Sequence, residues 1–166
     1  MKVHFRPVNE KNLQEMKELL LAEGPNEWNY ITDESIEQQL QLIREEKAYA
    51  ILAEEDRIHG FAVLILKEAS PDNLSKYDDL SSIAYINDVV VSSEQSGKGL
   101  GSKLLEKSID LARQNRCCKV YIERHEENLA SAGMMRKVGF EIVETFRDPV
   151  KRTSGSRKTC VLAKCT

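Results

Sequence analysis

The chain has 166 residues, of which 41% are hydrophobic and 31% are charged, and its formal net charge at pH 7 is −3. A slightly acidic chain lacks the concentrated basic face that nucleic acid requires. No stretch approaches the roughly 18 apolar residues of a membrane-spanning helix, and the N-terminal residues lack the apolar core of a signal peptide. We therefore expect a single cytoplasmic domain, residues 1–166, without nucleic-acid or membrane partners.

Four cysteines stand at positions 117, 118, 160 and 165. None of them has the paired spacing that a zinc site needs. Reduced thiols, packed as small apolar side chains, are the expected state, and no metal site is predicted.

Hydrophobic periodicity divides the chain into strands and helices. Strands are predicted at residues 3–8, 48–53, 58–66, 83–91, 119–124, 140–146 and 158–164. Helices are predicted to begin at Asn12, after a cap at Thr32 or Asp33, at Gly99 and at Leu129. The order βααββ–βαβαββ indicates a mixed sheet flanked by helices, an α+β fold with some α/β character.

Two details of the strand pattern matter below. In the strand over residues 119–124, the alternation predicts that Val120 and Ile122 point inward and that Tyr121 and Glu123 point outward. Residues 68–81 are polar and are predicted to form the longest internal loop.

A glycine-rich stretch follows the strand over residues 83–91. Three valines lead into a short polar loop, glycines occupy alternate positions 97, 99 and 101, and a helix begins at once. Glycines let the backbone come close to a ligand, and the first N–H groups of a helix have no internal partner. This arrangement predicts a phosphate site. A glycine-rich turn without a ligand is the alternative, because the pattern is not a Walker loop and Ser102 replaces the third glycine of a dinucleotide fingerprint.

A second motif lies about 25 residues further along, N-L-A-S-A-G-M-M-R-K-V-G-F over residues 128–140. Together with S-G-K-G-L-G over residues 96–101, it resembles the GNAT superfamily of acyl-CoA-dependent N-acetyltransferases. The resemblance covers nearly the whole chain. It implies the GNAT fold, a central, mostly antiparallel mixed sheet of about seven strands flanked by four helices, and acetyl-CoA as co-substrate.

The resemblance also implies which residues bind the cofactor: the strand backbone for the pantetheine, the glycine loop for the pyrophosphate and an asparagine for the pantetheine arm. These residues are Val89, Val90, Val91, Ser96, Gly97, Lys98, Gly99, Leu100, Gly101, Ser102 and Asn128. Two alternatives stay open, because Asn128 also suits a helix cap and Lys98 also suits a solvated surface.

Two residues depart from the family pattern. Ser96 replaces the Gln or Arg that opens the first signature, and Met135 replaces the tyrosine that serves many members as general acid. A thioether cannot donate a proton, so another group, backbone N–H groups or water must assist the leaving thiolate. His125 is one candidate, although a lone histidine at a strand end is more often structural.

The general base is expected on the strand before the glycine loop, where many family members carry a glutamate. Counting with period 2 places Tyr85 and Asn87 on the acceptor face and Asp88 on the other. Asp88 is the only acid on the strand, and a β-bulge would change its facing. Asp88, Asn87 and Tyr85 are therefore the catalytic candidates.

The resemblance places acceptor recognition in two loops. In the first, Glu27, Trp28 and Tyr30 could hold a cationic amine by charge and cation–π contacts, or the aromatic residues could close the edge of the core. The second, residues 147–156, is rich in basic residues and would suit an acidic group.

These observations predict an N-acetyltransferase that moves an acetyl group from acetyl-CoA to a primary amine by direct attack in a ternary complex. The acceptor would be a small molecule or a peptide. An acyl-CoA-binding or sensing module without efficient turnover is the alternative, because of Met135 and the missing strand glutamate. A homodimer is a candidate assembly, with Val161 and Leu162 of the last strand at the contact.

Overall fold

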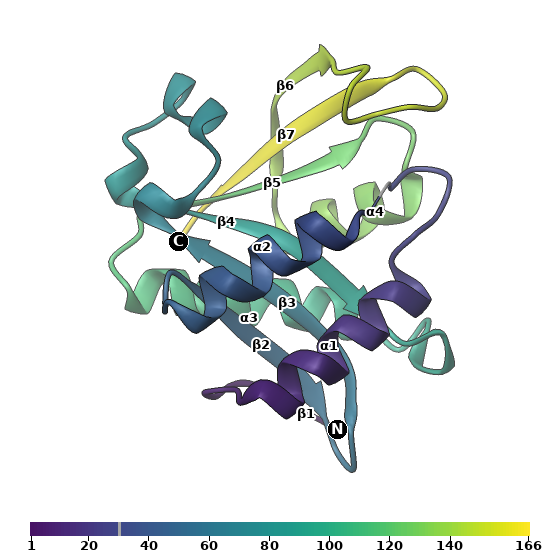
Figure 1. The fold of residues 1–166 in the computed structure, drawn as a ribbon. Helices are drawn as coiled ribbons and strands as arrows, with labels where there is room; N and C mark the ends of the chain where they lie inside the picture. Colours follow the sequence, from purple (N-terminus) through teal and green to yellow (C-terminus); the bar gives the residue numbers. More distant parts are fainter. Residues whose placement is uncertain (30) are drawn as a thin grey trace.

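The computed structural model describes residues 1–29 and 31–166. The described residues form a seven-stranded sheet and four α-helices, joined by turns and short 3₁₀ helices (Figure 1). The strands are β1 (Lys2–Phe5), β2 (Ala48–Glu54), β3 (Ile58–Leu66), β4 (Ile83–Val91), β5 (Lys119–His125), β6 (Glu141–Arg147) and β7 (Lys158–Cys165). The helices are α1 (Glu10–Glu23), α2 (Asp33–Arg44), α3 (Leu100–Gln114) and α4 (Leu129–Val138). The predicted α+β fold, with a mixed sheet and four helices, is confirmed.

The strand order in the sheet is β1-β2-β3-β4-β5-β7-β6. Within this sheet β4 and β5 pair in parallel, and every other neighbouring pair is antiparallel. The parallel pair requires a crossover, which α3 supplies between the end of β4 and the start of β5. The sheet is therefore mostly antiparallel, as predicted.

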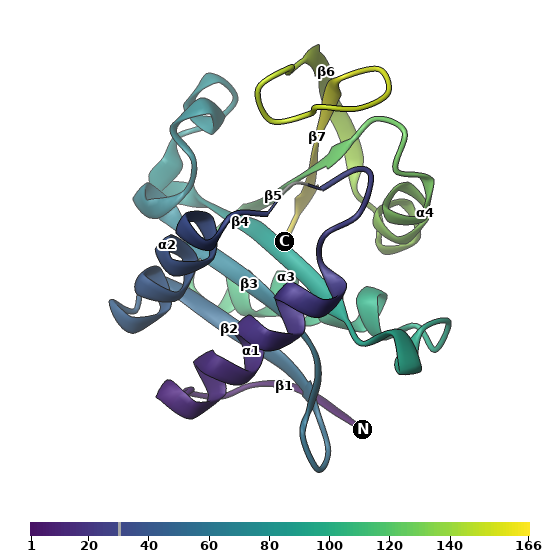
Figure 2. The same ribbon diagram turned by 45° about the vertical axis from the view of Figure 1, so that its right-hand side comes forward.

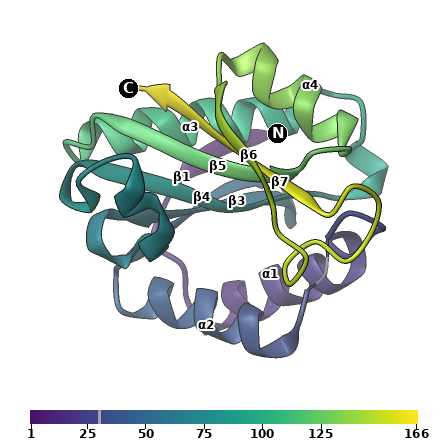
Figure 3. The same ribbon diagram turned by 90° about the horizontal axis from the view of Figure 1, so that it is seen from above.

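The helices cover both faces of the sheet (Figure 3). Helices α1 and α2 place residues such as Met16, Leu20 and Ile36 in one apolar cluster, on the face that includes Tyr85 of β4. Helix α3 places Leu104 and neighbouring apolar residues in a second cluster on the other face, together with Met135 of α4. Because helices cover both faces of the sheet, side chains on either face of a central strand are shielded from solvent.

Side-chain caps determine where the first two helices begin. Asn9 caps α1, because its Oδ1 accepts the Asn12 N–H at 2.9 Å while Asn12 Oδ1 accepts the Asn9 N–H at 3.1 Å. Helix α1 therefore begins two residues before the predicted Asn12. Thr32 rather than Asp33 caps α2, with Thr32 Oγ1 accepting the Ser35 N–H at 3.0 Å.

Two predicted segments differ from the structure. Strand β1 ends at Phe5 instead of residue 8, because Pro7 has no N–H for the ladder and Asn9 already caps a helix. The polar loop over residues 68–81 contains one whole 3₁₀ helix and part of each of two others, and its Leu74 is fully buried. Among the described helices, none is long and apolar enough to cross a membrane.

Candidate active site

The site begins where β4 and β5 separate. Their parallel pairing covers only four residue pairs, from Ile83 with Lys119 to Ile86 with Ile122, although both strands continue beyond it. Figure 1 shows the two strands diverging toward their carboxyl ends. A cleft of about 250 Å³ opens between them, lined by parts of β4, β5, α1, α2, α4 and the β6–β7 loop. The separation gives one cavity access to both faces of the sheet.

A β-bulge in β4 decides which side chains face the acceptor side of the cleft. Val63 of β3 pairs with Asp88 and Leu64 pairs with Ile86, so Asn87 is the extra residue. Val63 belongs to the cluster beneath α1 and α2, and directly opposite residues share a face. Asp88 therefore lies on the same face as Tyr85. The facing derived from strict period-2 counting was wrong for Asp88, because the bulge shifts the alternation by one residue.

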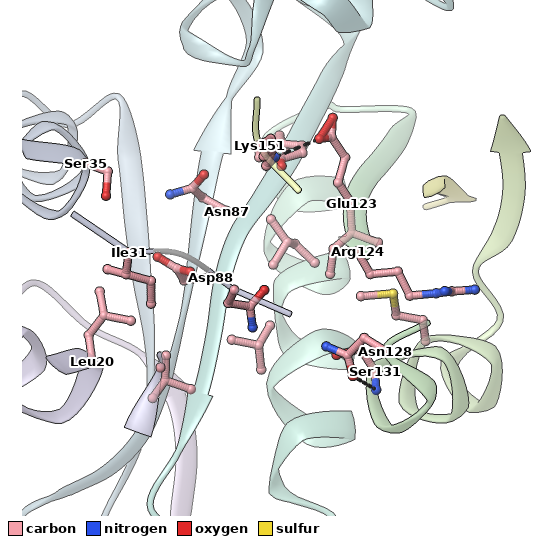
Figure 4. A pocket seen from close by; sticks show the side chains of 18 of the residues that line it. Leu20, Ile31, Ser35, Asn87, Asp88, Glu123, Arg124, Asn128, Ser131 and Lys151 are labelled. Atoms are coloured by element: carbon pink, nitrogen blue, oxygen red, sulfur yellow. Dashed lines mark hydrogen bonds and ion pairs between the residues drawn. The ribbon is translucent and has the colours of Figure 1, made fainter. Parts of the chain in front are cut away.

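The Asp88 carboxyl is half-buried in the cleft wall. Its burial raises the pKa to about 6 from an ordinary 3.8, while a hydrogen bond from Gln39 and the charge of Lys151 oppose that rise. Gln39 of α2 also accepts the Asn87 side-chain N–H at 2.6 Å. Asp88 and Asn87 lie on the side of β4 that faces Leu20, Ile31 and Ser35 (Figure 4). A carboxyl with a pKa near neutral is suited to general-base chemistry.

Tyr85 is the third catalytic candidate, and it lines the floor of the same cleft. It is 4% exposed, and burial raises the pKa of its hydroxyl to about 12. The hydroxyl therefore stays protonated at neutral pH and offers a hydrogen bond rather than a base.

A second carboxylate in the cleft, that of Glu123 on β5, was missed in the sequence. Its side chain is only 6% exposed, and its two oxygens accept hydrogen bonds from Lys151 Nζ at 2.9 Å and Asn73 Nδ2 at 3.2 Å. Tyr121 is likewise buried, with its hydroxyl donating to Asp78 Oδ2 at 2.7 Å. The predicted outward facing of both residues was wrong, because helices and the 67–82 segment cover that face. No periodic pattern marks such a strand, since both of its faces are buried.

The glycine loop follows the carboxyl end of β4 and leads into α3. Gly97 and Gly99 have φ values of +78° and +76°, and no heavy atom lies within 4 Å of a Cβ built at either position. The first hydrogen bond that closes α3 joins Lys103 N–H to Gly99 O at 3.2 Å, so the N–H groups of Leu100, Gly101 and Ser102 have no helical acceptor. The loop thus presents open backbone donors. Ser96 and Lys98 are exposed on the same loop, and Lys98 Nζ donates to Gln95 Oε1 at 3.2 Å.

The valines before the loop divide between the two faces. Val90 is buried in the cluster under α1 and α2, whereas Val89 and Val91 pack against the cluster under α3. Val89 and Val90 also line the cleft. On the β5 side, the backbone of β4 beyond Ile86 has no strand partner.

Asn128 caps α4 and lines the cleft at once. Its Oδ1 accepts the Ser131 N–H at 3.2 Å, and the residue is 7% exposed. The cap uses only the oxygen, so the amide N–H₂ group remains for a ligand. Met135, where the family pattern has tyrosine, is 3% exposed and packs in the α3 cluster.

His125 has a structural role. Its Nδ1 accepts the Glu127 N–H at 3.0 Å, which leaves the Nε2–H to donate to Ser154 O at 2.8 Å. The ring is fully buried and lies 4.7 Å from the Trp28 ring, centroid to centroid. With both nitrogens engaged, the imidazole has no lone pair or proton to offer to the cleft.

The two predicted acceptor loops contact each other. The Ser154 hydroxyl donates to Glu27 O, and Arg152 Nη1 donates to Trp28 O at 3.5 Å. Figure 2 shows the α1–α2 connection passing near the end of β5. The Glu27 and Trp28 side chains are not among those that line the cleft, and Tyr30 lies outside the described residues. From the second loop, Lys151 and Arg152 reach the cleft.

Comparison with known families identifies the fold. The profile of the Acetyltransferase (GNAT) family matches residues 13–140. The chain belongs to the GNAT acetyltransferase family. The matched residues include β4, the glycine loop and α3.

Solved structures of several acetyltransferases share this fold over nearly the whole chain. An acetyltransferase from Bacillus subtilis in complex with CoA has 19% identity and a TM-score of 0.72, and the match covers 99% of each chain. The ribosomal-protein-S18-alanine N-acetyltransferase from Escherichia coli has 14% identity and a TM-score of 0.74, covering 99% of this chain and 94% of the other. An aminoglycoside 6'-acetyltransferase type Ii has 18% identity and a TM-score of 0.72, covering 99% and 97%.

Proposed function

We propose that this GNAT protein, as one domain over residues 1–166, transfers an acetyl group from acetyl-CoA to a primary amine by direct attack in a ternary complex. The observation that carries the proposal is the cleft between β4 and β5. It extends from α4, on the side of the glycine loop, to the carboxyl of Asp88, whose pKa is about 6. The CoA complex of the Bacillus subtilis protein and the amine acceptors named for the Escherichia coli and aminoglycoside enzymes support it.

The cofactor side of the proposal rests on backbone donors. The open N–H groups at residues 100–102 and the unfilled space at Gly97 and Gly99 suit a pyrophosphate at the start of α3. The unpaired backbone of β4 beyond Ile86 suits the amide groups of a pantetheine, and the Asn128 amide N–H₂ suits its end near the thioester.

On the acceptor side, the ionised Asp88 takes a proton from the ammonium group of the acceptor. The freed nitrogen then forms the new C–N bond as the C–S bond of the thioester breaks, and the nitrogen gives its remaining extra proton to solvent. Met135 has no proton to give to the leaving thiolate. Arg124 lines the cleft on the α4 side, with its Nη1 held by His125 O and Glu126 O at 3.1 and 2.8 Å. Its fixed positive charge stabilises the thiolate until solvent protonates it.

A binding or sensing module without turnover is the second candidate, and Met135 is the observation that favours it. Titration with acetyl-CoA followed by an assay of free thiol release against a panel of primary amines separates the two. Binding with release for at least one amine is expected. Binding without release for any amine would support the sensor, and no binding would contradict both functions.

Substitution of Asn128 tests its two roles separately. Asn128→Ser retains a capping oxygen but loses the amide donor, so we expect stability within a few tenths of a kcal/mol of the parent and weaker acetyl-CoA binding. Asn128→Ala loses both and should cost about 1 kcal/mol of stability in addition. Thermal unfolding and calorimetric titration measure the two effects. Unchanged acetyl-CoA affinity in the serine variant would restrict Asn128 to the cap.

A further inference from the structure

The acceptor side of the cleft contains a buried cation that has no ion-pair partner among the described residues. Arg152 lines the cleft and is 5% exposed. Its Nε donates to Thr159 Oγ1 at 2.9 Å and its Nη1 donates to Trp28 O at 3.5 Å, both neutral acceptors. No carboxylate of the described residues lies within ion-pair distance of the guanidinium, and the Thr159 hydroxyl in turn donates to Asp148 Oδ2 at 2.8 Å. Burial lowers the pKa of the guanidinium, while the charges of Glu123 and Asp148 oppose that shift.

A buried hydroxyl lines the same cleft as this cation. It belongs to Tyr85, which is 4% exposed, and the charges of Lys151 and Arg152 act on it. No hydrogen bond of this hydroxyl is found among the described residues. Buried tyrosine hydroxyls normally find a partner. Arg152 and Tyr85 thus bring two buried donors to one cleft, and neither is hydrogen-bonded to a carboxylate of the described residues.

We propose that Arg152 and the Tyr85 hydroxyl bind a carboxylate of the amine acceptor, so that the acceptor is a small amino-carboxylic acid. This inference rests on the proposed function, in which Asp88 receives the amine. The acceptor is thus held at both ends by charges opposite to its own. The Asp88 carboxylate of β4 binds its amine, and the Arg152 guanidinium of the β6–β7 loop binds its carboxylate. Lys151 is already paired with Glu123 at 2.9 Å and contributes positive potential at the exposed end (Figure 4).

Charge and size favour a carboxylate over a phosphate and a small acceptor over a large one. Asp88 and Glu123 line the same cleft, and their charges would repel a dianion more strongly than a monoanion. The cleft of about 250 Å³ is smaller than the usual range for drug-sized ligands. The contacts between the α1–α2 and β6–β7 loops bound it on the acceptor side.

Matched acceptor pairs test this inference. Thiol release is measured with a panel of L-amino acids and with the corresponding L-amino-acid carboxamides. We expect the acids to exceed the amides in kcat/KM by about tenfold or more, mainly through KM, because the amides leave Arg152 unpaired. A carboxamide lowers the pKa of the neighbouring amine and so makes it easier to deprotonate, which means that amine reactivity alone would favour the amides. Equal or better use of the amides would overturn the proposal.

Variants connect the preference to the two residues. Arg152→Gln should abolish the preference for acids over amides, and Tyr85→Phe should reduce it. Arg147→Gln is the matched control, because Arg147 is exposed on β6 and lies outside the cleft. If thermal unfolding shows that Arg152→Gln does not fold, Arg152→Lys and Tyr85→Phe decide the question. A preference for acids that survives in those two variants at its parental size would contradict the assignment.

A failure of the proposed transferase function would give a different result from a failure of the carboxylate site. Absence of transfer to every acceptor, with acetyl-CoA still bound, contradicts the transferase and not the carboxylate site. Calorimetric titration of the CoA-loaded protein with the same acids and amides then tests the site alone. Tighter binding of the acids that is lost in Tyr85→Phe supports it, and equal or absent binding overturns it.

Discussion

Replacing Asp88 with asparagine is expected to lower kcat/KM for the amine acceptor by about 10²- to 10⁴-fold. Asparagine keeps the size and hydrogen-bonding ability of the side chain but cannot take a proton from the ammonium group. Acetyl-CoA affinity should stay near the parental value, because Asp88 faces the α1–α2 side of the sheet rather than the glycine loop. Steady-state kinetics by thiol release, with calorimetric titration of acetyl-CoA, separate the two effects.

The pH profile gives a second readout for the same residue. Asp88 acts as a base only when ionised, so the parental kcat/KM should fall as the pH drops below about 6. The residual activity of the asparagine variant should lack that acid limb. Stability should respond in the opposite sense. Because folding raises the pKa of Asp88, its ionisation destabilises the fold as pH rises through about 6, and the asparagine variant avoids that loss.

Asp110→Asn is a suitable control for this experiment. Asp110 is an acid on α3 that pairs with Arg113 near the surface and does not line the cleft. Its replacement should leave both kinetics and pH profile unchanged. An Asp88→Asn variant with parental kcat/KM and an unchanged acid limb would exclude Asp88 as the base.

Replacing Gly99 with valine is expected to weaken acetyl-CoA binding by about tenfold or more and to cost roughly 1–3 kcal/mol of stability. Gly99 has a φ of +76°, which a β-branched residue rarely adopts. No atom lies within 4 Å of the added Cβ, so the chain should still fold. The backbone must rotate to relieve the strain, and this moves the N–H groups at the start of α3. Calorimetric titration and thermal unfolding measure the two losses.

Gly133→Ala provides the matched glycine control. Gly133 lies inside α4, has no positive φ and has no atom within 4 Å of an added Cβ. Alanine should stabilise the helix by about 0.5–1 kcal/mol and leave acetyl-CoA affinity unchanged. If Gly99→Val bound acetyl-CoA as tightly as the parent, the pyrophosphate would have to be placed elsewhere.

The fold and the glycine loop could be predicted from the sequence because both are recorded in local patterns. Apolar periodicity located the seven strands and four α-helices of the described structure but not its short 3₁₀ helices, and alternate glycines before an amphipathic run located the start of α3. The family signatures then connected Asn128 with the same cleft. These features depend on residues close together in the chain, so a single sequence contains them.

The acceptor side of the cleft could not be predicted in the same way. The bulge at Asn87 comes from how β3 pairs with β4, and no residue type marks it in the sequence. Glu123 appeared to be a solvent-facing residue because the cover over that face comes from segments distant in the chain. Arg152 was one of several basic residues in a polar loop, and only the structure shows that it is buried. Each of these depends on tertiary packing.

The separation of β4 from β5 also gives the sheet an interior edge. Strand β4 beyond Ile86 has backbone groups on one side without a strand partner, much like the outermost strand of an open sheet. Such edges are prone to pair with extended segments of other chains and so promote aggregation. Here α4 and the two acceptor loops, which contact each other, flank the opening and cover part of this edge. The same elements that shape the cleft thus also shield the sheet from pairing with other chains.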